Sequence, residues 1–465
     1  MSEDLINMPE GKIKGRILLC GQVQCLSPLR IGCGSSDRSD IDILLDTNRQ
    51  PFIPATSFVG VLRHSIKSML PGNSGDNKKF KEFWGYMEEK EGQHEGQQSS
   101  LRCSDLYCVT PSPEMVIRDG IKIDHKTNIV KDQGKYDYEL VERGAVFDLK
   151  MEFSYKETDE SFVRQMVATI FSMLERGNIH IGAGSNSGFG EIELVKDRTK
   201  IYNFNFSKKE NVSRWLNYLN SRKLSEDSVM PAELYGKPLE INNNEFCIDA
   251  TFRLKNSFII RAYSDDPKMP DSTHIKSLND WIMTGTSLKG AVRARAERIV
   301  NTLALEKAET IVNGVFGYVD EKSHSGKSKK GRVRVSEVIL PKFVSERQTR
   351  IKIDRFTGGT IESALFDSMP LFTDFQDKTL HIQINIKNCK PYEAGLLLLV
   401  LKDLWTGDIA IGGEKNVGRG VFEGEKAIIK YNTDEPIIIE KDLNNLLTDE
   451  KEKLQGYVDA LVSEN

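Results

Sequence analysis

The chain has 465 residues, of which 39% are hydrophobic, and a formal net charge of −4. This length predicts two or three domains, and because no run reaches about 18 apolar residues we expect no membrane-spanning helix. Seven cysteines in so long a chain do not make a disulfide framework, which favours reduced thiols in a cytoplasmic protein. The slightly negative charge argues against a uniformly basic nucleic-acid binder, so any basic surface must be local.

The chain opens with a predicted strand, a polar loop and a helix. Alternating apolar residues predict the strand over residues 16–24. Thr56 and Ser57 are favourable N-cap residues, and apolar side chains at helical spacing follow them from Phe58 to Met69. We therefore expect a helix that starts at this Thr-Ser pair. The loop before it carries Asp37, Asp40, Asp42 and Asp46.

A long irregular insertion separates this helix from the next predicted strand, at residues 146–153. A second helix at residues 162–174 and a Gly-rich loop at residues 182–190 complete the unit. The loop follows a helix rather than a first strand, so it is not a dinucleotide-binding fingerprint. Its backbone N–H groups predict either a phosphate-binding nest or a tight hairpin turn.

A linker leads to a second unit of the same kind. The linker spans residues 206–244 and includes a predicted helix over residues 207–224, with Trp215, Leu216 and Leu219 on one face. Residues 245–435 then repeat the order strand, helix, insertion, strand, helix and Gly-rich loop. Residues 436–465 predict a polar helical tail.

The two units share sequence at one constant offset of 230 residues. The matched blocks are 56–63 with 286–293, 121–124 with 351–354, and 182–190 with 412–420. One offset kept along the whole chain indicates an internal duplication. The first domain is then residues 1–205 and the second is residues 245–435.

The order of elements predicts the fold class of each copy. Strand, helix, strand, helix and strand, with room for one more strand, is the order of a ferredoxin-like domain. We therefore expect an α+β protein with two tandem ferredoxin-like (RRM-like) domains and long insertions. The helices would cover one face of each sheet and leave the other face free for a partner.

These blocks resemble the RAMP superfamily, the repeat-associated protein group of CRISPR systems. The resemblance rests on the aspartate loop, the helix starts at residues 54–63 and 284–293, and the late Gly-rich loop. The first copy departs from the family pattern at Ala55 and Val59, where the pattern has Gly and Lys. The whole chain is similar to a tandem fusion of two backbone subunits of a type III, III-D-like CRISPR effector.

The resemblance implies a function in a multisubunit ribonucleoprotein. Each palm would hold the guide RNA (crRNA), and the insertions at residues 118–147 and 350–372 would be thumbs that enter the duplex with single-stranded target RNA. A loop aspartate, with a divalent metal ion such as Mg²⁺, would cut the target beside each thumb. The candidate catalytic residues are Asp40, Asp42 and, in the second copy, Asp271, with Asp265 and Asp266 more remote.

RNA contacts are expected at the helix starts, the insertions and the Gly-rich loops. Free N–H groups at a helix N-terminus bind phosphate, and hydroxyl and cationic side chains add donors. Each position also has an ordinary explanation as a helix cap, a surface cation or a tight turn, and a structural hydrogen bond suits Asp124 and Asp354 equally well. The candidates are Thr56, Ser57, Arg63, Lys122, Gly188, Thr286, Ser287, Lys289, Arg293, Lys352, Lys415, Gly418 and Arg419.

The basic stretch at residues 322–334 is either a solvated loop or an arm on a polyanion. Two other functions stay open at this point. One is a scaffold that binds RNA without cutting it. The other is an endoribonuclease that processes the guide precursor, which is less favoured because no histidine is matched between the copies. Cys103 and Cys108 lack a second ligand pair at zinc spacing, so no structural metal site is predicted.

Overall fold

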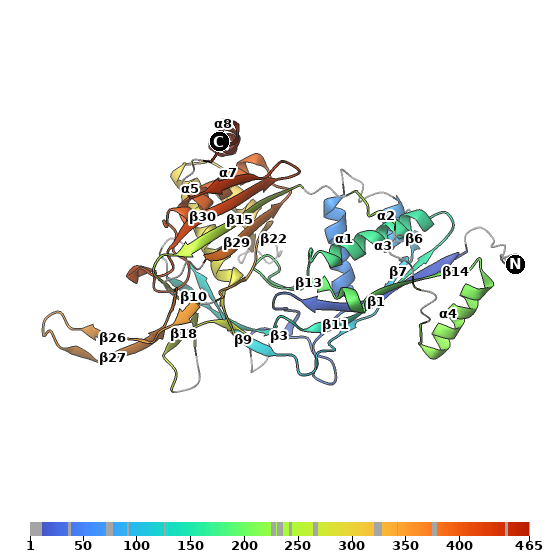
Figure 1. Ribbon diagram of the computed structural model, residues 1–465, viewed down its shortest axis with the longest axis horizontal. Coiled ribbons are helices and arrows are strands. Elements are labelled where there is room, and N and C mark those ends of the chain that lie inside the picture. Colours follow the sequence, from blue (N-terminus) through green and yellow to red (C-terminus); the bar gives the residue numbers. More distant parts are fainter. Residues whose placement is uncertain are drawn as a thin grey trace. The chain divides into compact units, whose positions relative to one another are not determined.

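The computed structural model groups the chain into two compact units (Figure 1). Unit 1 comprises residues 1–117, 139–183 and 190–242, and unit 2 comprises residues 118–138, 184–189 and 243–465. None of the described helices is long and apolar enough to span a membrane. The described residues are 12–35, 39–70, 78–90, 93–124, 127, 129–224, 229, 236–240, 244–263, 268–319, 328–341, 343–373, 379–441 and 445–464.

Unit 1 is built on an antiparallel sheet in the order β12-β13-β1-β11-β7, with β14 also paired to β1. The central strand β1 pairs with β11 along almost its whole length. The alternation that predicted this strand is therefore confirmed. The sheet strands are β1 (Gly15–Cys25), β7 (Leu101–Cys103), β11 (Val146–Tyr155), β12 (Ile179–His180), β13 (Glu191–Leu194) and β14 (Lys200–Asn205).

Helices pack on one face of this sheet and form the main core of unit 1. The helices are α1 (Ala55–Met69), α2 (Lys78–Trp84) and α3 (Glu160–Glu175). Phe58 and Leu62 of α1 pack with Ile17 and Leu19 of β1 in one buried cluster. Short strands complete the unit: β2 (Gly32–Gly34), β3 (Asp42–Ile43), β4 (Phe52–Ile53), β5 (Tyr86–Lys90), β6 (Gln93–Gln97) and β8 (Leu106–Tyr107).

The opposite face of the unit 1 sheet is covered by the linker helix α4 (Lys209–Ser221). Leu18 of β1 is buried there in a second cluster with Trp215 and Tyr218. The expectation of a free face is therefore wrong for the first copy. The predicted helix face was also partly wrong, because Leu216 and Leu219 are 57% and 43% exposed. Aromatic side chains bury more area than leucine, which favours the Trp-Tyr face.

Unit 2 repeats the design with a sheet in the order β23-β29-β15-β30-β31. Helices α5 (Gly285–Thr302), α6 (Ala308–Phe316) and α7 (Pro391–Trp405) pack on one face, in one cluster with the sheet. The tail forms α8 (Thr448–Val462), which packs on α7 so closely that a Cβ at Gly395 would collide with the Tyr457 carbonyl. The sheet strands are β15 (Glu245–Leu254), β23 (Val333–Val335), β29 (Thr379–Lys387), β30 (Phe422–Tyr431) and β31 (Ile437–Glu440).

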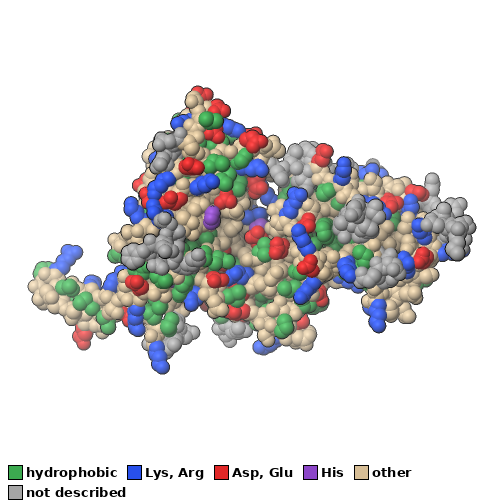
Figure 2. All heavy atoms as spheres, viewed as in Figure 1, with side chains coloured by type: hydrophobic (Ala, Val, Ile, Leu, Met, Phe, Trp, Pro, Cys, Tyr) green, Lys and Arg blue, Asp and Glu red, His purple; other side chains and the backbone are tan. Residues whose placement is uncertain are grey.

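The second insertion is a regular hairpin rather than an irregular loop. Strands β26 (Gln348–Ile353) and β27 (Thr360–Met369) pair antiparallel and project from unit 2 (Figure 1). Exposed apolar side chains lie along this hairpin (Figure 2), and Phe356 between the strands is 97% exposed. Shorter strands of unit 2 are β16 (Ser257–Phe258), β17 (Arg261–Ala262), β18 (Ser272–His274), β19 (Lys276–Ser277), β20 (Asp280–Met283), β21 (Gly317–Val319), β22 (Ser328–Lys330), β24 (Val338–Ile339), β25 (Phe343–Ser345) and β28 (Leu371–Thr373).

Two segments of the first copy belong to unit 2. One is most of the hairpin formed by β9 (Met115–Ile123) and β10 (Val130–Val141), whose Arg118 forms an ion pair with Glu337. The other is the loop of residues 184–189. In that loop, Ser187 makes a parallel bridge with Val335 of β23.

Candidate nucleic-acid interface

The motif helix of the first copy begins slightly earlier than predicted. The N-cap residue is Pro54, so Thr56 and Ser57 lie inside the first turn of α1 rather than at the cap. Both side chains are exposed, as is Arg63 two turns further on. A Cβ added at Gly60 would meet no atom within 4 Å. This side of α1 is therefore accessible to a polyanion.

The motif helix of the second copy is capped by Thr284, whose side chain accepts from the Ser287 backbone N–H at 3.4 Å. The predicted cap at Thr286 and Ser287 is thus two residues late in this copy as well. A Cβ at Gly285 would collide with the Ser187 carbonyl of the 184–189 loop. The first turn of α5 is therefore partly covered by that loop, although Thr286 stays exposed.

The two predicted arginines differ in their surroundings. Arg293 is tied into unit 2, because its guanidinium donates to the Glu297 carboxylate at 3.0 Å and to the Gly317 carbonyl at 3.0 Å. It also donates to Asn313 at 3.4 Å, so it joins α5 to α6 and the strand that follows. Arg63 is the more accessible of the matched pair.

A cluster of cations lies beside the loop of residues 184–189 in unit 2. Lys289 of α5, Lys330 of β22 and Arg334 of β23 act electrostatically on one another. Burial and these neighbours lower the pKa of Lys289 to about 8. Burial, then Arg334, likewise lowers the pKa of Lys387 in β29 to about 8. We call Lys289, Lys330, Arg334 and Lys387 the lysine cluster.

Sequence reasoning found only part of the lysine cluster. Lys289 stands in the repeated motif, and Lys330 and Arg334 close the basic stretch, whereas Lys322, His324 and Lys327 lie outside the described residues. Lys387 was missed. It sits at the end of an alternating strand, where nothing in the local pattern marks it for binding.

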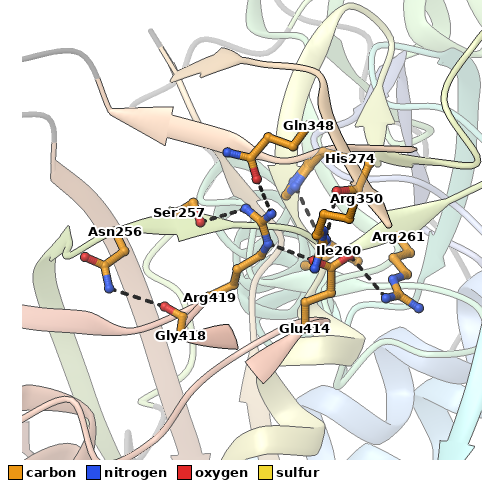
Figure 3. A network of polar contacts seen from close by, with 11 residues as sticks. Asn256, Ser257, Ile260, Arg261, His274, Gln348, Arg350, Glu414, Gly418 and Arg419 are labelled. Atoms are coloured by element: carbon orange, nitrogen blue, oxygen red, sulfur yellow. Dashed lines mark hydrogen bonds and ion pairs between the residues drawn. The ribbon is translucent and has the colours of Figure 1, made fainter. Parts of the chain in front are cut away.

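The second Gly-rich loop is held by a network of arginines (Figure 3). Glu414 accepts from Arg419 at 2.8 Å, from Arg261 at 3.2 Å and also from Arg350. Arg419 is 4% exposed and donates to Ser257 at 2.8 Å as well. Its guanidinium therefore braces the loop from inside. Lys415, by contrast, is exposed beside it.

The glycines of the two loops differ in exposure. Gly188 is buried, and a Cβ there would collide with the Glu337 backbone N–H. Gly418 has φ +82 and a carbonyl that accepts from Asn256 at 3.4 Å. Gly188 thus serves the packing of the first loop on unit 2, while Gly418 makes the tight turn that was the alternative to a phosphate nest.

Both acidic loops lie against the base of a hairpin. In unit 1, the backbone N–H of Glu139 in β10 donates to the Ile41 carbonyl at 2.9 Å, next to Asp40 and Asp42. In unit 2, the Asp367 N–H of β27 donates to the Asp271 carboxylate at 2.9 Å. Asp42 also accepts from Ser39 at 2.6 Å. Asp37, Asp265 and Asp266 lie outside the described residues.

The repeated aspartates of the hairpins shape the tips. Asp354 accepts from the Phe356 and Thr357 N–H groups at 2.9 and 2.8 Å, and these bonds hold the pKa of its carboxyl below the usual range. Asp124 accepts from the Thr127 N–H at 3.0 Å in the same way. The structural explanation for both aspartates is therefore confirmed. Lys122 and Lys352, two residues before them, are exposed on the strands.

Among the described residues there is no group of three or more His, Cys, Asp or Glu side chains that could hold a metal ion. Cys103 and Cys108 are half-buried, and burial raises the pKa of both thiols. His274 is buried at the end of β18, where burial lowers its pKa to about 4. Its ring contacts the Ile260 N–H and the Ile282 carbonyl, which is a structural role.

Comparison with known protein families gives a match to each copy of the repeat. Residues 22–193 and residues 251–423 each match the RAMP superfamily. The chain belongs to the RAMP superfamily. The two matched stretches coincide with the duplicated copies, so this RAMP protein carries the family domain twice. Among curated proteins, the comparison found no match.

RAMP proteins bind RNA and act in multisubunit CRISPR complexes, so membership gives this chain a CRISPR-associated RNA-binding role. The accessible candidates for that role are Thr56, Ser57, Arg63 and Lys122 in the first copy. In the second copy they are Thr286, Lys352 and Lys415, and Lys289 is half-buried. Arg293 and Arg419 are held by partners inside unit 2.

Proposed function

We propose that this RAMP protein is the backbone subunit of a type III-like CRISPR effector that binds guide RNA and cuts the paired target RNA once per copy. Each copy supplies a motif helix, a hairpin and an acidic loop. The strand order β7-β11-β1-β13 recurs as β23-β29-β15-β30. This common order supports a ferredoxin-like palm in both copies.

One observation carries the proposal of cleavage. In each copy the aspartate loop hydrogen-bonds to the second strand of its hairpin, at Glu139 and at Asp367. A target strand that runs past the hairpin base would meet a carboxylate there. The 2′-hydroxyl of RNA can act as the nucleophile, so the protein has to position the strand and assist proton transfer.

A divalent ion would fit this proposal as a shared ligand of protein and RNA. Mg²⁺ is commonly held by one or two carboxylates together with substrate phosphates. Asp40 and Asp42 in the first copy and Asp271 in the second would supply those carboxylates. The ion would stabilise negative charge at the scissile phosphate.

The test uses the assembled complex and a long matched target RNA whose products are sized. Asp40→Asn, Asp42→Asn and Asp271→Asn remove a charge while keeping an oxygen acceptor. We expect the Asp40 and Asp42 variants to slow the cut beside the first hairpin by about 100-fold or more, and the Asp271 variant to slow the cut beside the second hairpin by the same order. Asp46→Asn is the matched control, because Asp46 only caps a turn through Asn48 and Gln50 at 2.8 Å.

Two results would redirect the assignment. Unchanged cuts in the triple variant would leave an RNA-binding scaffold, the main alternative function. Cleavage of guide-precursor RNA by the lone chain would instead favour the processing endoribonuclease.

A further inference from the structure

The two Gly-rich loops share one backbone conformation. In the first loop the Ile181 N–H donates to the Gly190 carbonyl at 2.7 Å, and in the second the Ile411 N–H donates to the Gly420 carbonyl at 2.9 Å. Further backbone hydrogen bonds recur at matched places, from the N–H groups of residues 183, 187 and 190 and of residues 413, 417 and 420. The two loops therefore present the same shape to whatever packs against them.

The first loop docks on the edge strand β23 of unit 2. The Asn186 carbonyl accepts from the Val335 N–H at 3.3 Å, and the Asn186 side chain donates to the Gly331 carbonyl. The Lys330 ammonium donates to the Ser185 hydroxyl at 3.0 Å. Strand β23 is the last strand in the order of its sheet, so this loop covers an edge of the kind that readily pairs with another segment.

Docking of this loop depends on a glycine in the motif helix. A Cβ built on Gly285 would lie 2.2 Å from the Ser187 carbonyl oxygen. The loop approaches the first turn of α5 this closely because Gly285 has no side chain. An acceptor surface of this kind therefore needs glycine at the start of the helix that lies beside the edge strand.

The second loop presents matched docking groups to solvent. Asn416 and Gly418 repeat Asn186 and Gly188 at the offset of 230 residues. Residues 415–417 are exposed. The second loop therefore carries the backbone shape and the asparagine with which the first loop binds its edge strand.

Ion pairs within unit 2 hold the second loop in this shape. Glu414 has φ +56, a conformation that costs free energy for a residue other than glycine, and its counterpart in the first copy is Gly184 at φ +74. Arg261, Arg350 and Arg419 all donate to the Glu414 carboxylate (Figure 3). The loop thus keeps the docking conformation through contacts of its own unit.

One exchange in the second loop changes the chemistry of the partner that it suits. Ser185, which accepts from Lys330, is replaced in the second copy by Lys415. Because Lys415 is a cation, a lysine in the place of Lys330 would repel it, whereas a carboxylate there would attract it. The second loop therefore suits an acceptor surface that is acidic at this point.

The first copy of another molecule of this chain does not supply such an acceptor surface. Ala55 stands at the position of Gly285 in the motif helix. In the same docked arrangement its Cβ would collide with the carbonyl of the incoming loop. Asp105, three residues beyond the edge residue that corresponds to the middle of β23, is already used, because it accepts from the Ala55 N–H at 2.7 Å.

The incoming side also lacks the ion pair that accompanies the first loop. In unit 2, Arg118 of the first hairpin pairs with Glu337. Gln348 stands at the position of Arg118 in the second hairpin, and its side chain accepts from Arg419. A second copy of the chain would therefore meet both a steric collision and the loss of a buried ion pair.

We propose that the second Gly-rich loop docks on the edge strand of a different protein, and that Ala55 excludes a second copy of this chain. The partner carries a helix that begins with glycine beside that strand, and a carboxylate that faces Lys415. The strand supplies backbone hydrogen bonds, and the glycine and the carboxylate select the partner. The contact gives the proposed backbone subunit its neighbour and rests on that role, although no RNA takes part in it.

The test converts the first-copy edge into the inferred acceptor. The β5–β6 and β21–β22 hairpins pair in the same register, so Gln98 corresponds to Lys330. Ala55→Gly/Gln98→Glu therefore supplies both the glycine and the carboxylate. Sedimentation velocity of the full chain without RNA, over a range of concentrations, measures self-association. We expect a monomeric wild type and a variant whose association constant is about tenfold or more higher, because the collision is removed.

Two matched variants separate the contributions to this contact. Gln98→Glu alone keeps Ala55 and should stay monomeric. Lys415→Glu/Asn416→Ala, added to the associating variant, reverses one charge and removes one amide of the loop, and should restore the monomer. Circular dichroism shows whether each variant keeps its fold.

A measurement on the single chain tests the glycine requirement without any association. Gly285→Ala places a Cβ against the Ser187 carbonyl, so the docked first loop should open more often. Peptides that contain residues 184–189 should then exchange hydrogen about tenfold or more faster than in the wild type.

Self-association of the wild-type chain would overturn the exclusion by Ala55. A folded Ala55→Gly/Gln98→Glu variant that stays monomeric, or a Gly285→Ala variant with unchanged exchange, would overturn the docking itself. None of these results bears on RNA binding or cleavage, which the aspartate variants test separately in the assembled complex.

Discussion

The ion pair between Arg118 and Glu337 gives the sharpest test of how the first hairpin is anchored in unit 2. Its N–O distance is 2.7 Å, and the two side chains are 3% and 5% exposed. Truncating one partner of a buried pair leaves an uncompensated charge and costs about 3–5 kcal/mol. We therefore expect Arg118→Ala to destabilise the hairpin base by that order.

A surface ion pair on the same hairpin provides the control. Lys135 lies 3.4 Å from Asp119, and the lysine side chain is 62% exposed. Exposed pairs contribute about 0–1 kcal/mol, so Lys135→Ala should change little. The double variant Arg118→Met/Glu337→Leu should recover much of the lost stability, because apolar replacement removes both buried charges.

Hydrogen exchange followed by mass spectrometry measures the local stability of the hairpin base. Opening of a segment raises exchange of its own amides, and each 1.4 kcal/mol is a factor of ten in the opening constant. Peptides of β9, β10 and β23 should exchange at least 100-fold faster in Arg118→Ala than in the wild type. If Arg118→Ala exchanges no faster than Lys135→Ala, the pair does not anchor the hairpin.

Three further predictions concern stability. Gly285→Ala should destabilise the folded chain by about 1–3 kcal/mol, because the added Cβ would collide with backbone atoms. Gly290→Ala has open space around its Cβ and should stabilise the chain by about 0.5–1 kcal/mol. Thermal unfolding measures both changes. Trp215→Ala should cost about 3–5 kcal/mol and expose the sheet face under α4, seen as dye binding and earlier unfolding. The pKa values of Lys289 and Lys387 are about 8 in the folded protein, below the unfolded value of 10.5. The unfolded chain therefore binds more protons between pH 8 and pH 10.5, so the stability of the fold should rise over that range. Replacing both lysines by Gln should stabilise the RNA-free chain at pH 7 by about 1–3 kcal/mol and flatten that rise.

The elements that the sequence predicted well are those with a local period. The alternating apolar residues of β1 and β15 and the helical spacing of apolar residues in α1 each follow from burial of one face. Such a pattern can be recognised within about ten consecutive residues. Because the domain is duplicated, each element could be predicted from two stretches of sequence. A weak signal in one copy was supported by its match in the other.

The features that escaped depend on contacts far apart in the chain. Arg118 and Glu337 are 219 residues apart, and nothing near either residue marks the pairing. Arg419 resembled an accessible phosphate ligand, but Ser257 and Glu414 hold it inside the loop. Local patterns report which residues favour burial, whereas the partner of a buried charge is set by tertiary packing.

The central claim is that both copies contact the same RNA. Crosslinking of the full chain to a single-stranded RNA containing 4-thiouridine, followed by mass spectrometry of the peptides, tests it most directly. The account predicts RNA-linked peptides from both motif helices, α1 at Ala55–Met69 and α5 at Gly285–Thr302. Crosslinks confined to one helix, or absent from both, would contradict it.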